Sequence, residues 1–158
     1  MHEALEALIR FEERVSSFYV WLSAELIEDS EAAQLFITLA AQEQGHAERL
    51  RMEERILVED ERELEVHPDV SQAVEISVKA MDGFMARPEP PGSIEALGFT
   101  LDLESRSGEQ LGRALLAEAV PELARTLGAL EREDARHAEM LQEALALRLR
   151  RRRAANEL

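Results

Sequence analysis

Apolar residues recur every three or four positions along most of the chain, which is the spacing of one face of an α-helix. The first stripe predicts a helix from about residue 3 to 27. Its inward positions are Leu5, Leu8, Glu12, Val15, Tyr19, Leu22 and Leu26. Asp29 and Ser30 are favourable turn and N-cap residues, so a second helix is predicted to start there and to reach about residue 59. Because this connection is short, the two helices should be antiparallel neighbours.

A second pair of helices is predicted between about residues 93 and 150. The first of them should run from Ser93 to about Ala119. Its inward positions are Leu97, Leu101, Glu104, Leu111 and Leu115. The other should begin at Pro121, because proline suits the first turn of a helix. Its inward positions are Leu123, Leu127, Leu130, Asp134, His137, Leu141 and Leu145.

Residues 60–92 are predicted to form a long crossover that returns the chain to the start of the second pair. Pro68 and Asp69 open a short helix within it. The apolar positions of this helix are Val70, Val74, Val78, Met81 and Met85. The sequence therefore predicts an all-α single domain over residues 1–158. We expect a four-helix bundle with helix pairs at about 3–59 and 93–150 and a crossover at about 60–92 that contains a short helix.

Two copies of a carboxylate-x-x-His motif interrupt the apolar stripes. Residues three apart share a helix face, and the second copy lies 91 positions after the first. Each copy is preceded, about 30 positions earlier, by an inward acidic residue. The six candidate site residues are Glu12, Glu43, His46, Glu104, Asp134 and His137. One such motif occurs by chance on exposed helices, but two copies in register with the core stripes favour a shared interior site.

Carboxylates and imidazoles in a core need compensation, and a bound metal ion uses both as ligands. Four carboxylates balance two divalent cations, and the mixed oxygen and nitrogen donors favour iron or manganese over magnesium or calcium. We expect two iron ions, with manganese or zinc as possible substitutes. Glu43 and Asp134 would bridge the ions, while Glu12 and Glu104 would be terminal ligands. Each histidine should bind one ion and donate its other N–H to an acceptor that the sequence does not identify.

The composition of the chain excludes several classes of function. The chain has 158 residues, of which 46% are hydrophobic, and it contains no cysteine. This excludes disulfides, iron–sulfur clusters and thiol chemistry. The net charge of −15 argues against a nucleic-acid partner. The apolar runs are short and no leader is recognisable, so we expect no membrane span and a cytoplasmic location.

Several other residues have more than one interpretation. Tyr19 is expected to be a core residue, with a hydrogen bond to a metal ligand or a radical relay as alternatives. Trp21 lies off the inward stripe and is a candidate for a subunit contact. Positive charges are favourable at the C-terminal end of a helix, so the arginines between residues 148 and 153 predict a solvated helix end. The alternative for this tail is a docking patch for an acidic partner or a membrane. His2 and His67 are expected at the surface.

The motifs resemble those of the ferritin-like superfamily and, within it, the rubrerythrin branch. The resemblance rests on the acidic residue ahead of Phe18 and Tyr19, on Glu43-Gln-Gly-His46-Ala-Glu-Arg-Leu, and on the copies of both in the second half. It implies a four-helix bundle, a di-iron centre with oxygen or peroxide chemistry, and a homodimer or larger homo-oligomer.

Departures from the family narrow what the resemblance implies. Rubrerythrins add a cysteine-rich rubredoxin domain, so a cysteine-free chain would need an external electron-donor protein. Ser107 stands where rubrerythrins carry an additional glutamate, and Asp134 stands where a glutamate is expected. Bacterioferritins have a haem-binding methionine at the position of Gln44, so no haem is predicted.

Together these features favour a di-iron oxidoreductase of the ferroxidase or peroxidase type, which oxidises Fe(II) or reduces peroxide or dioxygen. The first alternative is an iron-storage subunit similar to bacterioferritin. The second is a metal-free helical interaction module that uses the arginine-rich tail or the crossover helix.

Overall fold

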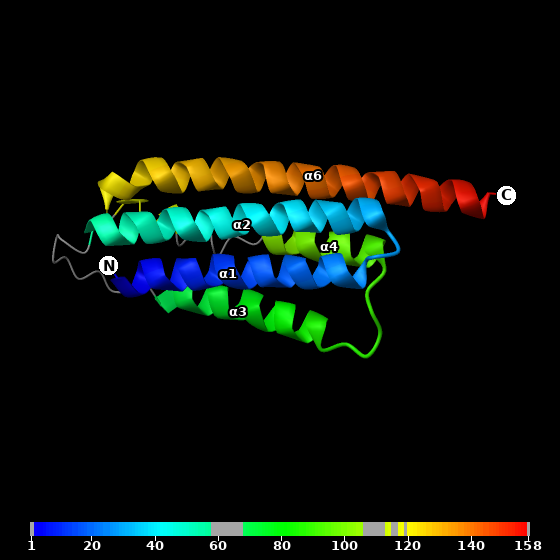
Figure 1. The fold of residues 1–158 in the computed structure, drawn as a ribbon, viewed down its shortest axis with the longest axis horizontal. Helices are drawn as coiled ribbons and strands as arrows, with labels where there is room; N and C mark the ends of the chain where they lie inside the picture. Colours follow the sequence, from blue (N-terminus) through cyan, green and yellow to red (C-terminus); the bar gives the residue numbers. More distant parts are fainter. Residues whose placement is uncertain (1, 58–67, 106–112, 115–116, 119, 158) are drawn as a thin grey trace.

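The computed structural model describes residues 2–57, 68–105, 113–114, 117–118 and 120–157, and the side chains of these except for 2–4, 57 and 68–73. The elements are α1 (His2–Glu25), α2 (Ser30–Leu57), α3 (Pro68–Met85), α4 (Ser93–Glu104), the 3-10 turn η2 (Pro121–Leu123) and α6 (Ala124–Asn156). Over these ranges the chain contains helices and no strand (Figure 1). The predicted all-α class is confirmed.

Helices α1 and α2 form an antiparallel pair joined by a tight turn (Figure 1). Asp29 caps α2, because its side chain accepts a hydrogen bond of 3.1 Å from the backbone N–H of Ala32. The inward positions predicted for α1 are all buried, and they are Leu5, Leu8, Glu12, Val15, Tyr19, Leu22 and Leu26. The apolar stripe therefore placed Glu12 in the interior correctly.

Helix α3 begins at Pro68, as predicted for the short helix within residues 60–92, and it lies alongside α1 (Figure 1). Met81 is fully buried, and Val74, Val78 and Met85 pack against the same core. The side chain of Val70 lies outside the described residues. Trp21 of α1 is partly buried and packs against Phe18 and Phe84 of its own chain.

Helix α4 ends at Glu104, whereas the apolar pattern predicted a helix to about Ala119. Ser105 closes its last turn, since both its N–H and its hydroxyl donate to the carbonyl of Leu101. Ser17 and Thr38 make the same side-chain bond inside α1 and α2, so this bond alone does not end a helix. Leu111 and Leu115 lie outside the described side chains. Pro121 opens η2, which leads directly into α6.

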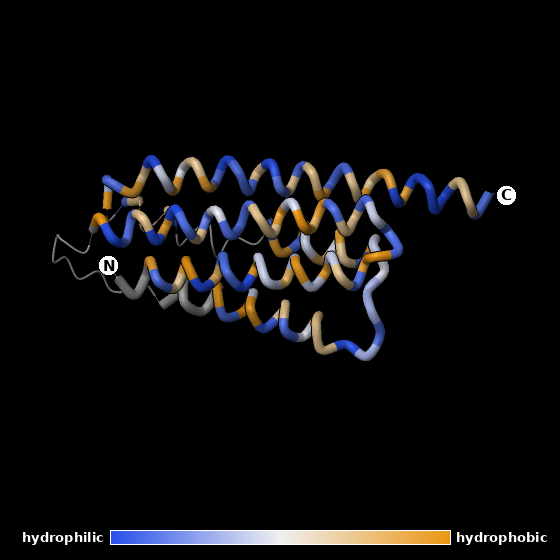
Figure 2. Tube along the Cα trace, viewed as in Figure 1, coloured by the Kyte–Doolittle hydropathy of each residue, from blue (hydrophilic) through white to orange (hydrophobic). Residues whose placement is uncertain are grey.

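Two apolar clusters fill the interior on either side of a polar layer. On α1, Leu8 belongs to one cluster and Val15 to the other, with Glu12 between them. On α6, Leu130 and Leu141 likewise belong to opposite clusters. On the antiparallel α2 the order is reversed, with Leu39 in the cluster of Val15 and Leu50 in the cluster of Leu8. Figure 2 shows hydrophobic positions recurring along α1 and α2 between hydrophilic ones. Among the described helices, none has the length and hydropathy that a membrane-spanning segment needs.

Arg148 differs from the solvated tail that the sequence predicted, because only 7% of it is exposed. Its guanidinium donates two hydrogen bonds of 2.6 Å to the carboxylate of Asp29. Arg151 is itself exposed and bonds to the exposed Glu31 nearby, and Arg152 is exposed as well. Arg148 therefore fastens α6 to the turn between α1 and α2, and the rest of α6 projects past that turn (Figure 1).

This ion pair predicts a pH-dependent stability. The bonds from Arg148 hold the pKa of Asp29 well below its usual value, so the stabilisation is complete above the unfolded pKa and is lost as the pH falls below about 4. Arg148→Met should lower the free energy of unfolding by about 1 kcal/mol at pH 7, measured by urea denaturation. The deficit should shrink toward pH 2, and Arg152→Met should show none. A deficit as large at pH 2 as at pH 7 would contradict the assignment.

Candidate metal centre

Four of the six predicted site residues are almost completely buried in the polar layer between the two apolar clusters. Glu12 on α1 is 1% exposed, Glu43 and His46 on α2 are 2% and 0% exposed, and His137 on α6 is 1% exposed. Asp134 on α6 and Glu104 at the end of α4 are partly exposed. Helical spacing explains the placement, because each residue continues the apolar stripe of its own helix.

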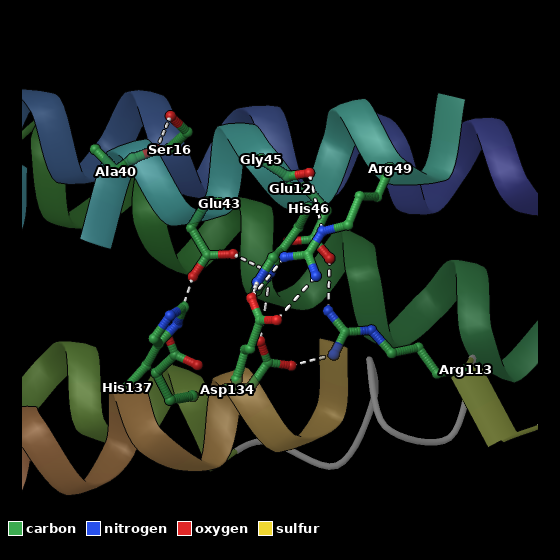
Figure 3. Close-up of polar contacts among 12 residues, drawn as sticks. Glu12, Ser16, Ala40, Glu43, Gly45, His46, Arg49, Arg113, Asp134 and His137 are labelled. Carbon is green, nitrogen blue, oxygen red and sulfur yellow. Dashed lines mark hydrogen bonds and ion pairs between the residues drawn. The ribbon is translucent and has the colours of Figure 1, made fainter. Parts of the chain in front are cut away.

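Glu43 lies between the two histidines (Figure 3). One of its oxygens, Oε2, is 3.0 Å from Nδ1 of His46, and the other, Oε1, is 2.9 Å from Nδ1 of His137. The two imidazole rings are nearly parallel, with centroids 5.5 Å apart and planes inclined by 9°. Nδ1 of His46 also lies 3.7 Å from Oε2 of Glu12 and 3.5 Å from Oδ1 of Asp134. Five of the six predicted residues therefore converge.

Over the described part of the chain, two sets of three side chains are spaced to hold a metal ion. We call Glu12, Glu43 and His46 the first ligand group, and Glu43, Asp134 and His137 the second. In each group the ligand atoms lie within 4.8 Å of one another. Glu43 is common to both groups, as expected for a bridging carboxylate, whereas Asp134 belongs to the second alone.

The donor atoms of this centre fit a bound cation. Nε2 of His137 is buried without a hydrogen-bond partner in the described residues. Nδ1 of each histidine faces carboxylate oxygens, at 2.9 to 3.7 Å. A buried polar atom without a partner costs roughly 1–3 kcal/mol. Imidazole nitrogens and carboxylate oxygens together are ligands that iron, manganese and zinc accept. A metal ion would therefore lie between imidazole nitrogens and carboxylate oxygens that already face one another, and it would offer a partner to Nε2 of His137.

Charges within the layer shift the pKa values of the groups that face one another. Burial lowers the pKa of His46, but the carboxylates of Glu12 and Glu43 outweigh burial and raise it to about 11. Burial raises the pKa of Glu43, but His137 and His46 lower it to about 2. In the metal-free chain, Glu43 is therefore a carboxylate and His46 an imidazolium.

Glu104 belongs to neither ligand group. The hydroxyl of Tyr19 donates a hydrogen bond to Oε1 of Glu104, so Tyr19 is both a core residue and a donor to a predicted ligand. Burial and the charge of Glu43 raise the pKa of Glu104 well above its usual value. Glu104, Glu12, Glu43 and Asp134 line one cavity of about 10 Å³, which is room for about one water molecule.

Each histidine was expected to donate its second ring N–H to an acceptor. For His46 this acceptor is Glu133. Oε2 of Glu133 lies 3.1 Å from Nε2 of His46. Arg49 donates to both oxygens of Glu133, at 2.8 and 2.5 Å, and lowers the pKa of Glu133 to about 2. The sequence analysis did not select Glu133 or Arg49. The available signal was their spacing, because Arg49 is three positions after His46 and Glu133 is four before His137.

Arg113 is a third residue of the site, after Glu133 and Arg49, that was not predicted from the sequence. Its guanidinium donates to Oε1 of Glu12 at 2.5 Å and to Oδ2 of Asp134 (Figure 3). Arg113 lies outside every motif and every predicted apolar stripe position, so no sequence signal indicated it. It adds a buried cation to a layer in which only carboxylates and histidines were expected.

Comparison of the chain with protein-family models, with curated proteins and with solved structures gives no match. The resemblance to the ferritin-like superfamily therefore rests on the motifs within this sequence. Any function has to follow from the donor atoms, their spacing and their burial.

Proposed function

We propose that the chain is a ferritin-like four-helix bundle, built from α1, α2, α4 and α6 with α3 in the crossover, that holds a di-iron carboxylate centre. It would oxidise Fe(II) or reduce peroxide or dioxygen, which makes it an oxidoreductase of the ferroxidase or peroxidase type. One observation carries the proposal: Glu43 is shared by two ligand groups, each of which has its own histidine.

The two ligand groups would hold the ions, with Glu43 as the shared carboxylate. Bound iron would supply the change of oxidation state that a chain without cysteine otherwise lacks. Manganese or zinc could occupy the same donors, because geometry and availability rather than affinity separate these metals. We propose that the chain forms a homo-oligomer, with a dimer as the simplest form. A separate donor protein would supply its electrons.

The surrounding residues of the chain position the ligands and restrict access. Glu133, held by Arg49, fixes the ring of His46 through Nε2. Tyr19 holds Glu104 at the wall of the cavity. That cavity of about 10 Å³ admits molecules of about the size of water, and the apolar clusters on either side exclude bulk solvent. Organic substrates do not fit a cavity of this size.

Iron analysis tests the proposal against its alternatives. Purified chain is loaded anaerobically with excess Fe(II), freed of unbound metal and analysed by mass spectrometry, and Fe(II) oxidation is then followed after addition of dioxygen or peroxide. We expect about two iron ions per chain at saturation and their oxidation. Many iron atoms per chain would favour the storage subunit. No bound iron would favour the metal-free interaction module and reject the proposal.

Glu133 provides a more detailed test of the first ligand group. Glu133→Leu removes the acceptor of His46 and should weaken Mn(II) binding by about 10- to 100-fold, since partners of this kind orient metal-binding histidines. The measurement is a calorimetric titration of the metal-free chain. Glu131→Leu, at an exposed position of the same helix, is the matched control and should bind as the unchanged chain does. Equal affinities for the two variants would show that Glu133 does not support the site.

A further inference from the structure

Arg113 places a fixed positive charge inside the candidate centre. Only 4% of this residue is exposed, and its guanidinium spans from Glu12 on α1 to Asp134 on α6. Glu12 belongs to the first ligand group and Asp134 to the second. A single cation of the chain therefore connects the two ligand groups (Figure 3).

The guanidinium leaves the inner oxygens of both carboxylates free for a metal ion. It bonds to Oε1 of Glu12 and Oδ2 of Asp134. The other oxygens, Oε2 of Glu12 and Oδ1 of Asp134, face Nδ1 of His46 at 3.7 and 3.5 Å. Arg113 can therefore keep its bonds while the inner oxygens act as ligands.

Charge balance then favours one divalent ion over two. The two ligand groups contain three carboxylates, those of Glu12, Glu43 and Asp134. Arg113 neutralises one of the three negative charges, and one divalent cation neutralises the other two. Arg49 and Glu133 balance each other as an ion pair, and Glu104 lies outside both groups. A second divalent ion would give the buried groups a net positive charge, which is costly where water screens little.

We infer that Arg113 is a built-in counter-cation that makes the centre bind one divalent ion tightly and a second one weakly. This inference rests on the proposed function, because it concerns the loading of the same site. Even when it is screened as in bulk water, at a dielectric constant of about 80, a unit charge roughly 3 Å from a divalent ion changes the affinity by about 100-fold, and a buried charge is screened less. Because the first ion meets a net charge of −2 and the second meets a net charge of zero, the second Mn(II) ion should bind at least about 100-fold more weakly than the first.

An anaerobic Mn(II) titration of the full-length chain, with free Mn(II) counted by electron paramagnetic resonance, measures the two steps separately. Arg113→Gln removes the charge, and the second step should tighten by roughly 10- to 100-fold. Arg113→Lys keeps the charge and should retain the separated steps. Arg136→Gln removes a positive charge from an exposed position of α6 and should change neither step. A role of Arg113 in folding alone would not make the second step depend on charge in this way.

The outcomes separate this inference from the proposed function. Two ions of equal affinity in the unchanged chain would overturn the inference and leave the proposed function standing, and this result is available even if Arg113→Gln does not fold. Equal effects of Arg113→Gln and Arg113→Lys on the second step would also overturn it. A chain that binds neither Mn(II) nor Fe(II) would overturn the proposed function together with the inference.

Discussion

Replacing both Glu43 and His46 by alanine should abolish iron loading, from about two ions per chain to none. Glu43 supplies one oxygen to each ligand group, and His46 is the only nitrogen donor of the first. The first group would keep a single carboxylate, from Glu12, and the second would keep Asp134 and His137. Two ligands are too few to retain a divalent ion through the removal of unbound metal. The measurement is metal analysis after anaerobic loading.

Glu48→Ala is the matched control for this double variant, because it removes a carboxylate from an exposed position of the same helix. It should load as much iron as the unchanged chain. Circular dichroism of the double variant checks that its helix content is retained. Undiminished loading of a folded double variant would reject the assignment of Glu43 and His46 as ligands.

Metal binding should also raise the melting temperature of the chain, and this is the second large effect that we expect. A metal ion that binds the folded chain at about 1,000 times its dissociation constant stabilises that chain by about 4 kcal/mol. For a domain of this size, such a stabilisation corresponds to a rise in Tm of roughly 10 °C. Calorimetry with Mn(II), compared with the chelator-treated chain, measures the rise. The physical reason is the cluster of buried carboxylate oxygens and imidazole nitrogens, which are ligands for a cation and face one another across the layer.

The acidic surface of the chain requires a specific control, because a net charge of −15 attracts cations without any site. The double variant at Glu43 and His46 keeps nearly all of this charge and should gain no more than about 1 °C. Mg(II) should also stabilise little, since it prefers oxygen ligands and retains its water. An equal rise in Tm for the double variant would assign the stabilisation to the surface.

Periodicity of apolar residues was sufficient to predict most of the helices and the burial of their polar interruptions. Glu12 and His137 could be placed in the interior because each occupies a position of an otherwise apolar stripe. The repeat of the carboxylate-x-x-His motif then indicated that Glu43 and Asp134 face a common region. These inferences needed helix geometry alone.

Features that depend on contacts between distant segments were not predictable in this way. Arg113 and Glu12 are 101 positions apart, and neither belongs to a motif that would connect them. Arg148 was interpreted from its neighbours, a run of arginines, whereas its burial follows from the carboxylate of Asp29. The end of α4 at Glu104 is also not encoded in the apolar pattern, which continues to Leu111 and Leu115.

The most direct test of the account is an anomalous-scattering map at the iron absorption edge, from crystals of the chain loaded anaerobically with excess Fe(II). The account predicts peaks on either side of Glu43, one near His46 and one near His137. At limiting Fe(II), the inferred role of Arg113 predicts that one peak predominates. A loaded crystal with no anomalous density at Glu43, or with iron at the acidic surface alone, would contradict the central claim that these buried side chains form a metal centre.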